Sequence, residues 1–207
     1  SGSNINTSGN ASLVFKYTIQ SGDTDSNGIS IGANVLALNN GTIMDRAGNF
    51  AEDLAHSAVP DNSSYKVDTT APSVDNFTMN DTELKIGDNA TVTLKFSEPV
   101  CVSTSECTRS ETNVADPYFS DADITFPALA NGNPPGTLSM ISDDNESWEG
   151  TFTPRTNTED DNNSLSLGTG YTDLAGNNGP DNQTANYEVD TLAPTVSSMS
   201  ITGAAGV

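Results

Sequence analysis

The sequence predicts an all-β protein built from β-sandwich domains. Three observations lead to this prediction: short segments alternate apolar and polar residues, helix signals are almost absent, and one block of sequence occurs twice at a domain-sized spacing. Ser, Thr, Asn, Asp and Gly interrupt every window that is long enough for a helix. Many short strands separated by clusters of turn residues are typical of β-sandwiches.

The alternation is clearest in four segments. Residues 13–19 and 90–96 carry large apolar side chains at every second position, apart from the small Ala90, and shorter alternations occur at 148–152 and 187–190. Successive side chains of a strand point to opposite faces of the sheet. Each segment therefore predicts a strand with one buried face.

The internal repeat supports a series of domains. Residues 64–74 (SYKVDTTAPSV) match residues 186–196 (NYEVDTLAPTV). Upstream of each copy lies the pattern Asp-x-Ala-Gly-Asn, at 45–49 and at 173–177. The order is the same both times, and the offset is about one sandwich domain, which is the signature of a repeat protein.

Each Val-Asp-Thr-x-Ala-Pro predicts a last strand, a linker stiffened by Pro72 or Pro194, and the start of a new domain. We therefore expect residues 1–70 to be the second half of a domain, incomplete at its N-terminus. We expect residues 71–192 to form a complete sandwich. Residues 193–207 are either the first strand of a following domain or a strand donated to a neighbour.

Two interpretations of the chain ends stay open. One is a piece cut from a longer repeat array. The other is a protomer whose C-terminal strand completes the N-terminal half-domain of an identical subunit. Such a head-to-tail contact does not close on itself and would build a filament.

The charge of the chain excludes one class of partner. Lys and Arg number 7 against 28 acidic residues, for a net charge of -21. Nucleic acid is not expected as a partner, because phosphate contacts need a basic face. No apolar run is long enough to insert into a membrane. The acidity serves either solubility or cation binding; Asp beside Asn and Gly is typical of oxygen-rich calcium loops.

The middle segment resembles the bacterial immunoglobulin-like (BIg) tandem repeats of giant extracellular adhesins and biofilm surface proteins. The matching stretches include VTLKFSEPV at 92–100, WEGTFTP at 148–154 and YTDLAGN at 171–177, and they cover most of residues 71–193. The first segment resembles the second half of a sister repeat. The resemblance implies immunoglobulin-like (Ig-like) domains in a linear rod at the cell surface. It also implies neighbouring repeats as partners and calcium between domains.

A first candidate metal site is the loop that opens with Asp23, Asp25 and Asn27 and turns at Gly28. The spacing matches the opening of a calcium loop. An EF-hand is excluded, because its twelfth position would be Asn34 where a bidentate Glu is needed. A β-turn calcium site and an Asx-rich hairpin that binds nothing both remain open.

A second candidate occurs twice, once in each copy of the repeat. We expect the Asp-x-Ala-Gly-Asn loop to lie at the pole where the last strand exits, so that the linker Asp joins it there. Two or three carboxylates plus backbone carbonyls would suffice for calcium. The alternative is turn and capping chemistry. The residues are Asp45, Asn49 and Asp68, then Asp173, Asn177 and Asp190, with Glu98, Asp143 and Asp144 as lesser candidates.

The two cysteines, Cys101 and Cys107, lie six positions apart. A zinc site would need more ligands and a redox pair tighter spacing. We predict a local disulfide in an oxidising, extracellular compartment; two unrelated reduced thiols are the alternative.

Asn-x-Ser/Thr patterns are dense along the chain. They indicate either glycosylation or an Asn/Thr-rich surface that matches the pattern by chance. The candidates in turns are Asn40, Asn62, Asn145, Asn162 and Asn182.

Catalysis is not predicted. His56 is the lone histidine and is expected to be a solvated loop residue, and neither a Gly-x-Ser-x-Gly elbow nor a P-loop occurs. Two functions compete: a structural segment of an extracellular stalk or filament, and a module that binds carbohydrate or a cell surface. The second needs an exposed aromatic platform, whereas Trp148 lies in an alternating strand and is predicted to be core.

Overall fold

The computed structural model describes residues 14–45, 47–102, 118–142 and 144–203. The chain divides into two compact parts, Ser1–Thr70 and Ala71–Val207, here called unit 1 and unit 2. Along the described residues, no helix has the length and apolar character needed to cross a membrane.

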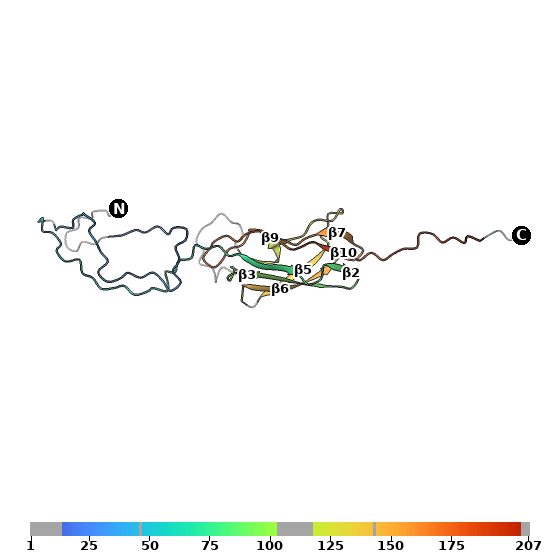
Figure 1. The fold of residues 1–207 in the computed structure, drawn as a ribbon, viewed down its shortest axis with the longest axis horizontal. Helices are drawn as coiled ribbons and strands as arrows, with labels where there is room; N and C mark the ends of the chain where they lie inside the picture. The colour runs from blue at the N-terminus through green and yellow to red at the C-terminus, as the bar shows by residue number, and fades with distance from the viewer. Residues whose placement is uncertain (1–13, 46, 103–117, 143, 204–207) are drawn as a thin grey trace. The chain divides into compact units, whose positions relative to one another are not determined.

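Unit 2 consists of short strands joined by turns (Figure 1). The one helical element among its described residues is the 3-10 turn η1 (Asp121–Asp123). The strands are β1 (Val74–Met79), β2 (Glu83–Lys85), β3 (Ala90–Phe96), β4 (Ile124–Thr125), β5 (Gly136–Ser142), β6 (Ser147–Pro154), β7 (Glu159–Asn163), β8 (Ser166–Leu167), β9 (Asn182–Gln183) and β10 (Tyr187–Asp190). The predicted all-β fold is confirmed.

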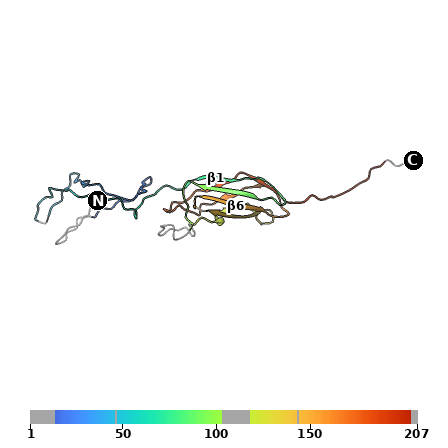
Figure 2. The ribbon, with the colours of Figure 1, turned by 90° about the horizontal axis from the view of Figure 1, so that it is seen from below.

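The strands form three sheets around one core. The largest has the order β1-β3-β6-β5, and the two smaller ones have the orders β2-β10-β7 and β4-β8-β9. β3 pairs antiparallel with both β1 and β6, whereas β10 runs parallel to β2. Figure 2 shows β1 and β6 extending along the unit.

β3 shows how the sequence pattern produces this core. Ala90, Val92, Leu94 and Phe96 are all buried, and the polar residues between them lie on the other face. Aromatic rings then join the sheets, because Phe152 of β6 lies 5.2 Å, centroid to centroid, from the ring of Tyr187 on β10. Such contacts between the inner faces of two sheets hold an Ig-like sandwich together.

β3 also separates the two ends of unit 2. The chain enters at Ser73, whose carbonyl accepts a 2.9 Å hydrogen bond from the amide of Ser97, just after β3. It leaves after Asp190, which pairs with Lys85 shortly before β3. Because β3 has 7 residues, it spans roughly 20 Å. The chain therefore enters and leaves unit 2 at opposite ends, which we name the entry pole and the exit pole.

Unit 1 has a different character. Its described residues form no extended strand, and only Gly28 among them is buried. Three isolated bridges connect these described residues: Asp25 to Val67, Ile31 to Val59, and Met44 to Phe50.

The strand predicted at 13–19 is not formed. Residues 14–20 take part in no bridge, and Leu13 lies outside the described residues. Phe15 and Tyr17 are 72% and 71% exposed. A strand needs a hydrogen-bonded neighbour and a face to pack against, and the described part of unit 1 offers this segment neither.

The C-terminal segment after Thr191 has no secondary structure as far as Gly203, and each of its residues from Leu192 to Gly203 is exposed. Residues 204–207 of the predicted following or donated strand lie outside the described residues.

Candidate functional site

The two Asp-x-Ala-Gly-Asn loops build the same turn. In unit 2, Asp173 Oδ1 accepts hydrogen bonds from the amides of Gly176 (2.6 Å) and Asn177 (2.9 Å). Its Oδ2 accepts a third bond, 2.7 Å long, from the Asn177 side chain. In unit 1, Asp45 Oδ1 accepts from the amides of Ala47 and Asn49, both at 2.9 Å.

The other features of the turn also coincide in the two copies. Asp45 Oδ2 accepts a 2.7 Å bond from the Asn49 side chain, as Asp173 does from Asn177. The motif glycines Gly48 and Gly176 have φ values of 94° and 95°. This left-handed conformation is open to glycine at little cost, which explains the glycine of the motif. In both units the aspartate therefore caps its own turn.

The two copies of the turn differ in how deeply the aspartate is buried. Asp173 is fully buried and forms a bridge with Val100, whereas Asp45 is exposed. The side-chain amide of Asn49, followed by its backbone amide, lowers the pKa of the Asp45 carboxyl, because these donors stabilise its charged form.

The structure does not bring Asp173 and Asp190 together. Asp173 lies beside Val100, just beyond the end of β3, so the Asp-x-Ala-Gly-Asn loop is at the entry pole. Asp190 ends β10 at the exit pole. The expectation that the loop lies where the last strand exits is therefore wrong, because the length of β3 separates the two carboxylates.

The aspartate of the Val-Asp-Thr motif makes the same hydrogen bond in both units. Asp68 Oδ1 accepts a bond from the amide of Thr70 (2.9 Å), and Asp190 Oδ1 accepts one from the amide of Leu192 (3.1 Å). Each aspartate closes an Asx turn at the end of its unit.

The threonine of the same motif fastens the last segment to its unit. Thr191 Oγ1 donates to the carbonyl of Arg155 (2.6 Å) and accepts from the amide of Thr158 (3.0 Å). In unit 1, Thr69 Oγ1 donates to the carbonyl of Asp23 (3.0 Å) and accepts from the amide of Gly22 (2.9 Å). Sequence reasoning passed over these threonines, although their recurrence in both copies was visible.

Replacing Thr191 with valine is expected to lower the free energy of unfolding of unit 2 by about 2 kcal/mol, because a buried amide and a carbonyl lose their partner. Thr191 is 6% exposed, so water cannot readily replace its hydroxyl. Urea unfolding followed by Trp148 fluorescence measures the change. Thr191→Ser keeps the hydroxyl and is the matched control; equal losses in both variants would contradict the hydrogen-bonding role.

The 23–28 loop of unit 1 uses its carboxylates for its own backbone. Asp23 Oδ2 accepts 2.8 Å bonds from the amide of Gln20 and the hydroxyl of Tyr17, and these donors lower the pKa of the Asp23 carboxyl. Asp25 Oδ1 accepts a 2.8 Å bond from the amide of Gly28. The side chain of Asn27 donates to Asp61. The contacts are those of an Asx-rich hairpin, and calcium binding here stays a prediction.

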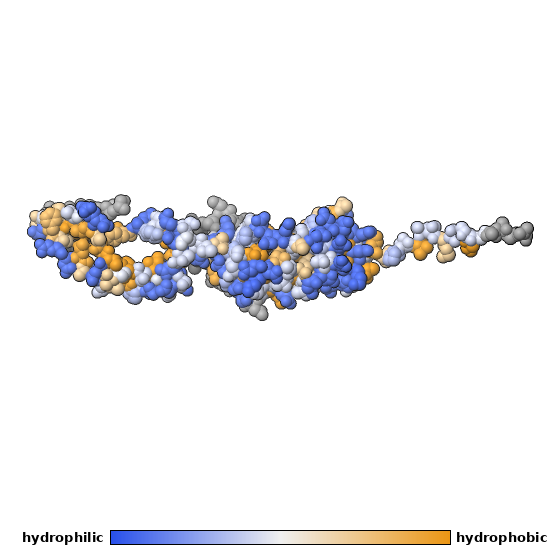
Figure 3. All heavy atoms as spheres, viewed as in Figure 1, coloured by the Kyte–Doolittle hydropathy of each residue, from blue (hydrophilic) through white to orange (hydrophobic). Residues whose placement is uncertain are grey.

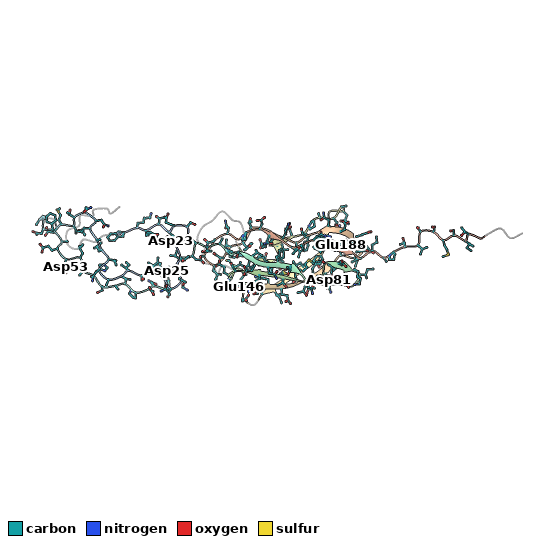
Figure 4. All side chains as sticks on the ribbon, in the orientation of Figure 1. Asp23, Asp25, Asp53, Asp81, Glu146 and Glu188 are labelled. Atoms are coloured by element: carbon teal, nitrogen blue, oxygen red, sulfur yellow. The ribbon has the colours of Figure 1, made fainter. Side chains whose placement is uncertain are left out.

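The acidic residues of unit 2 are spread over both poles. Figure 4 shows Glu146 toward one end of the unit, and Asp81 and Glu188 toward the other. At the entry pole, Glu98 and Asp173 offer carboxylate oxygens within 4.8 Å of each other. Asp144 caps the β5–β6 turn by accepting from the amides of Ser147 (2.7 Å) and Glu146 (2.9 Å), which lower its pKa. Asp143 lies outside the described residues.

Cys101 is disulfide-bonded and fully buried. Its amide donates to the carbonyl of Thr172, and its carbonyl accepts from the amide of Phe119, both at 2.8 Å. Cys107 is the only other cysteine in the sequence, and it lies outside the described residues.

The candidate glycosylation sites lie mostly at the surface. Asn145 is half-buried, whereas the other four are exposed; these are Asn40, Asn62, Asn162 and Asn182. Asn40 and Asn145 have positive φ values of 69° and 61°, so both occupy turns. Asn162 lies in β7 and Asn182 in β9, so the expectation that these two lie in turns is wrong. Their modification stays a prediction.

His56 has a local structural role. Its Nε2 accepts a 3.1 Å hydrogen bond from the amide of Val35, and its Nδ1 lies 2.9 Å from the carbonyl oxygen of Ser57. These contacts fit a neutral ring that donates from Nδ1. The residue is half-buried, so the expectation of a solvated side chain was only partly right.

Residues 115–189 match the family model of the bacterial Ig-like domain. The match runs as far as β10, lies wholly within unit 2, and supports a bacterial Ig-like domain there. No curated protein and no solved structure matches the chain significantly. Domains of this kind are commonly exposed at the surface and generally lack enzymatic activity, and the match suggests a structural or surface-associated module.

Proposed function

We propose that the chain is a non-catalytic structural segment of an extracellular surface protein, in which Ig-like units act as spacers stiffened by calcium at their junctions. The observation that carries this proposal is the shared chemistry of the two repeated motifs. In both units the polar side chains of the two motifs bond to the backbone. The aspartate of Asp-x-Ala-Gly-Asn caps a turn, and the threonine of Val-Asp-Thr attaches the last segment to its unit. Polar side chains that bond to the chain's own backbone stabilise the fold, as expected for a structural domain.

We propose that this calcium binds at the entry pole of unit 2. Glu98 and Asp173 already hold carboxylate oxygens within 4.8 Å of each other. Asp173 uses three hydrogen bonds, and a carboxylate has about four acceptor positions, so one remains for a cation. The proposal takes a third carboxylate from the linker, where Asp68 precedes Ser73 by five residues. Backbone carbonyls and water would complete the about six to eight oxygens that calcium requires.

Calcium is expected to raise the melting temperature of the chain, because a ligand that binds only the folded form stabilises it by about 2.7 kcal/mol at a hundredfold excess over its Kd. Calorimetric titration gives the Kd, and melting with calcium or EDTA gives the shift. Asp68→Asn and Glu98→Gln are expected to weaken binding at least tenfold, and Glu188→Gln at the exit pole to leave it unchanged.

The calcium proposal fails if melting is the same in calcium and EDTA, or if Glu188→Gln weakens binding as much as Glu98→Gln. The spacer role is tested separately by glycan-array binding. A specific glycan bound by the wild-type chain would favour the binding module. The position of Trp148 argues against that module, since its ring packs 4.6 Å from that of Phe119, centroid to centroid.

A further inference from the structure

The C-terminal segment repeats the sequence that forms β1. Residues 71–79 read APSVDNFTM and residues 193–201 read APTVSSMSI. Both have proline at the second position and large apolar residues at the fourth, seventh and ninth. In the C-terminal segment these residues are Val196, Met199 and Ile201.

The structure of β1 explains this spacing. Strict alternation would put the fourth and seventh positions on opposite faces of a strand. β1 contains a register shift between Val74 and Asn76 in its pairing with β3. The extra residue turns the strand, so Val74, Phe77 and Met79 all pack against the core. The same irregularity would place Val196, Met199 and Ile201 on one face.

These three side chains are almost wholly exposed in the described part of the chain. Val196, Met199 and Ile201 are 85%, 90% and 97% exposed. Moving apolar side chains of this size out of water is favourable, so the segment has a strong tendency to associate.

Unit 1 presents the complementary surface. Phe15, Tyr17 and Ile19 alternate along a segment that belongs to no bridge, and all three are exposed. Ile31 and Val59, which do pair with each other, are 48% and 49% exposed. Figure 3 shows hydrophobic residues (orange) at the surface of unit 1 and along the C-terminal segment. In the described part of unit 1, no second layer covers these residues.

We propose that residues 193–201 of one copy dock as a strand on unit 1 of a second copy, alongside residues 14–19, with Val196, Met199 and Ile201 against the exposed apolar side chains. Backbone groups of the two unpaired segments would then satisfy each other. Each copy carries both surfaces, and the contact is head-to-tail, so association continues into a linear chain.

A second copy suits this contact better than the same chain does. The C-terminal segment leaves unit 2 at the exit pole, and the linker to unit 1 joins at the entry pole. To reach its own unit 1, the segment would have to run back along unit 2, roughly 20 Å for β3 alone. Only Thr191 and Leu192 lie between β10 and residue 193, and about 10 Å of extended chain cannot cover that distance. Residues 193–201 of the same chain could therefore not dock as a strand on its own unit 1.

Sedimentation equilibrium of the full chain over a wide concentration range tests this inference. It rests on the structural role proposed for the chain but not on calcium, so every measurement is made in EDTA. The wild type is expected to form species larger than a dimer at high concentration. The triple variant Val196→Asp, Met199→Asp, Ile201→Asp and the variant Phe15→Asp are each expected to lose all association.

Ser197→Asp is the matched control, because β1 carries an aspartate, Asp75, at the equivalent position. It is expected to associate like the wild type. A mixture of the triple variant and Phe15→Asp should form a one-to-one dimer and nothing larger, since only one intact surface remains on each. A monomeric wild type, association that survives in the triple variant, or a mixture that stays monomeric would overturn the proposal. Unchanged near-ultraviolet dichroism shows that unit 2 stays folded in each variant.

Discussion

Phe152→Ala is expected to lower the free energy of unfolding of unit 2 by about 3–5 kcal/mol, the largest loss among the substitutions considered. The Phe152 ring is fully buried and lies 5.2 Å from the ring of Tyr187 and 5.9 Å from that of Phe126. Alanine would leave a cavity between two sheets whose backbones are held by their own hydrogen bonds. The sandwich cannot collapse to fill it without breaking those bonds.

Urea unfolding followed by Trp148 fluorescence measures this loss, because the only tryptophan lies in β6 of unit 2. Phe15→Ala is the control: its ring is 72% exposed in unit 1, and the transition of unit 2 should not change. A loss for Phe152→Ala as small as that of Phe15→Ala would contradict the assignment of Phe152 to the core.

Asp173→Ala is expected to cost about 3 kcal/mol, since hydrogen bonds to a charged group contribute about 1.5–3 kcal/mol each and are not additive. The carboxylate is fully buried and accepts from Gly176, Asn177 and the Asn177 side chain. Removal leaves the donors of a tight turn without their acceptor. Unfolding in EDTA keeps any contribution of calcium out of the measurement.

Two comparisons sharpen this prediction. Asp173→Asn keeps one acceptor oxygen but turns a donor toward the Asn177 side chain, so it should lose less stability than Asp173→Ala. Asp45→Ala removes the same network from an exposed turn of unit 1. It should speed amide exchange at Ala47 and Asn49 without lowering the stability of unit 2. Equal stability of wild type and Asp173→Ala would show that the turn forms without its cap.

The local contacts of each candidate residue were predictable from the sequence, but which of these residues lie close together was not. The repeat identified two equivalent pairs, Asp45 with Asp173 and Asp68 with Asp190. Asp45 and Asp173 both accept from the backbone and side-chain amides of the motif asparagine, and Asp68 and Asp190 both accept from the amide two residues later. A turn depends on a few neighbouring residues, so its chemistry can be deduced from a short motif. Which carboxylates meet depends on strand order and strand length, which a motif does not contain.

The sequence by itself determined that this protein is all-β, since the alternation in β3 and the turn residues around each strand leave no other way to bury Val92, Leu94 and Phe96. Only the tertiary structure decided that Asp173 and Asp190 lie at opposite poles, and that an irregularity in β1 aligns Val74, Phe77 and Met79. It also decided that residues 14–20 form no strand. Alternation of apolar and polar residues predicts which face of a segment would be buried. A strand forms only where another part of the fold provides a hydrogen-bonded neighbour and a layer that covers that face.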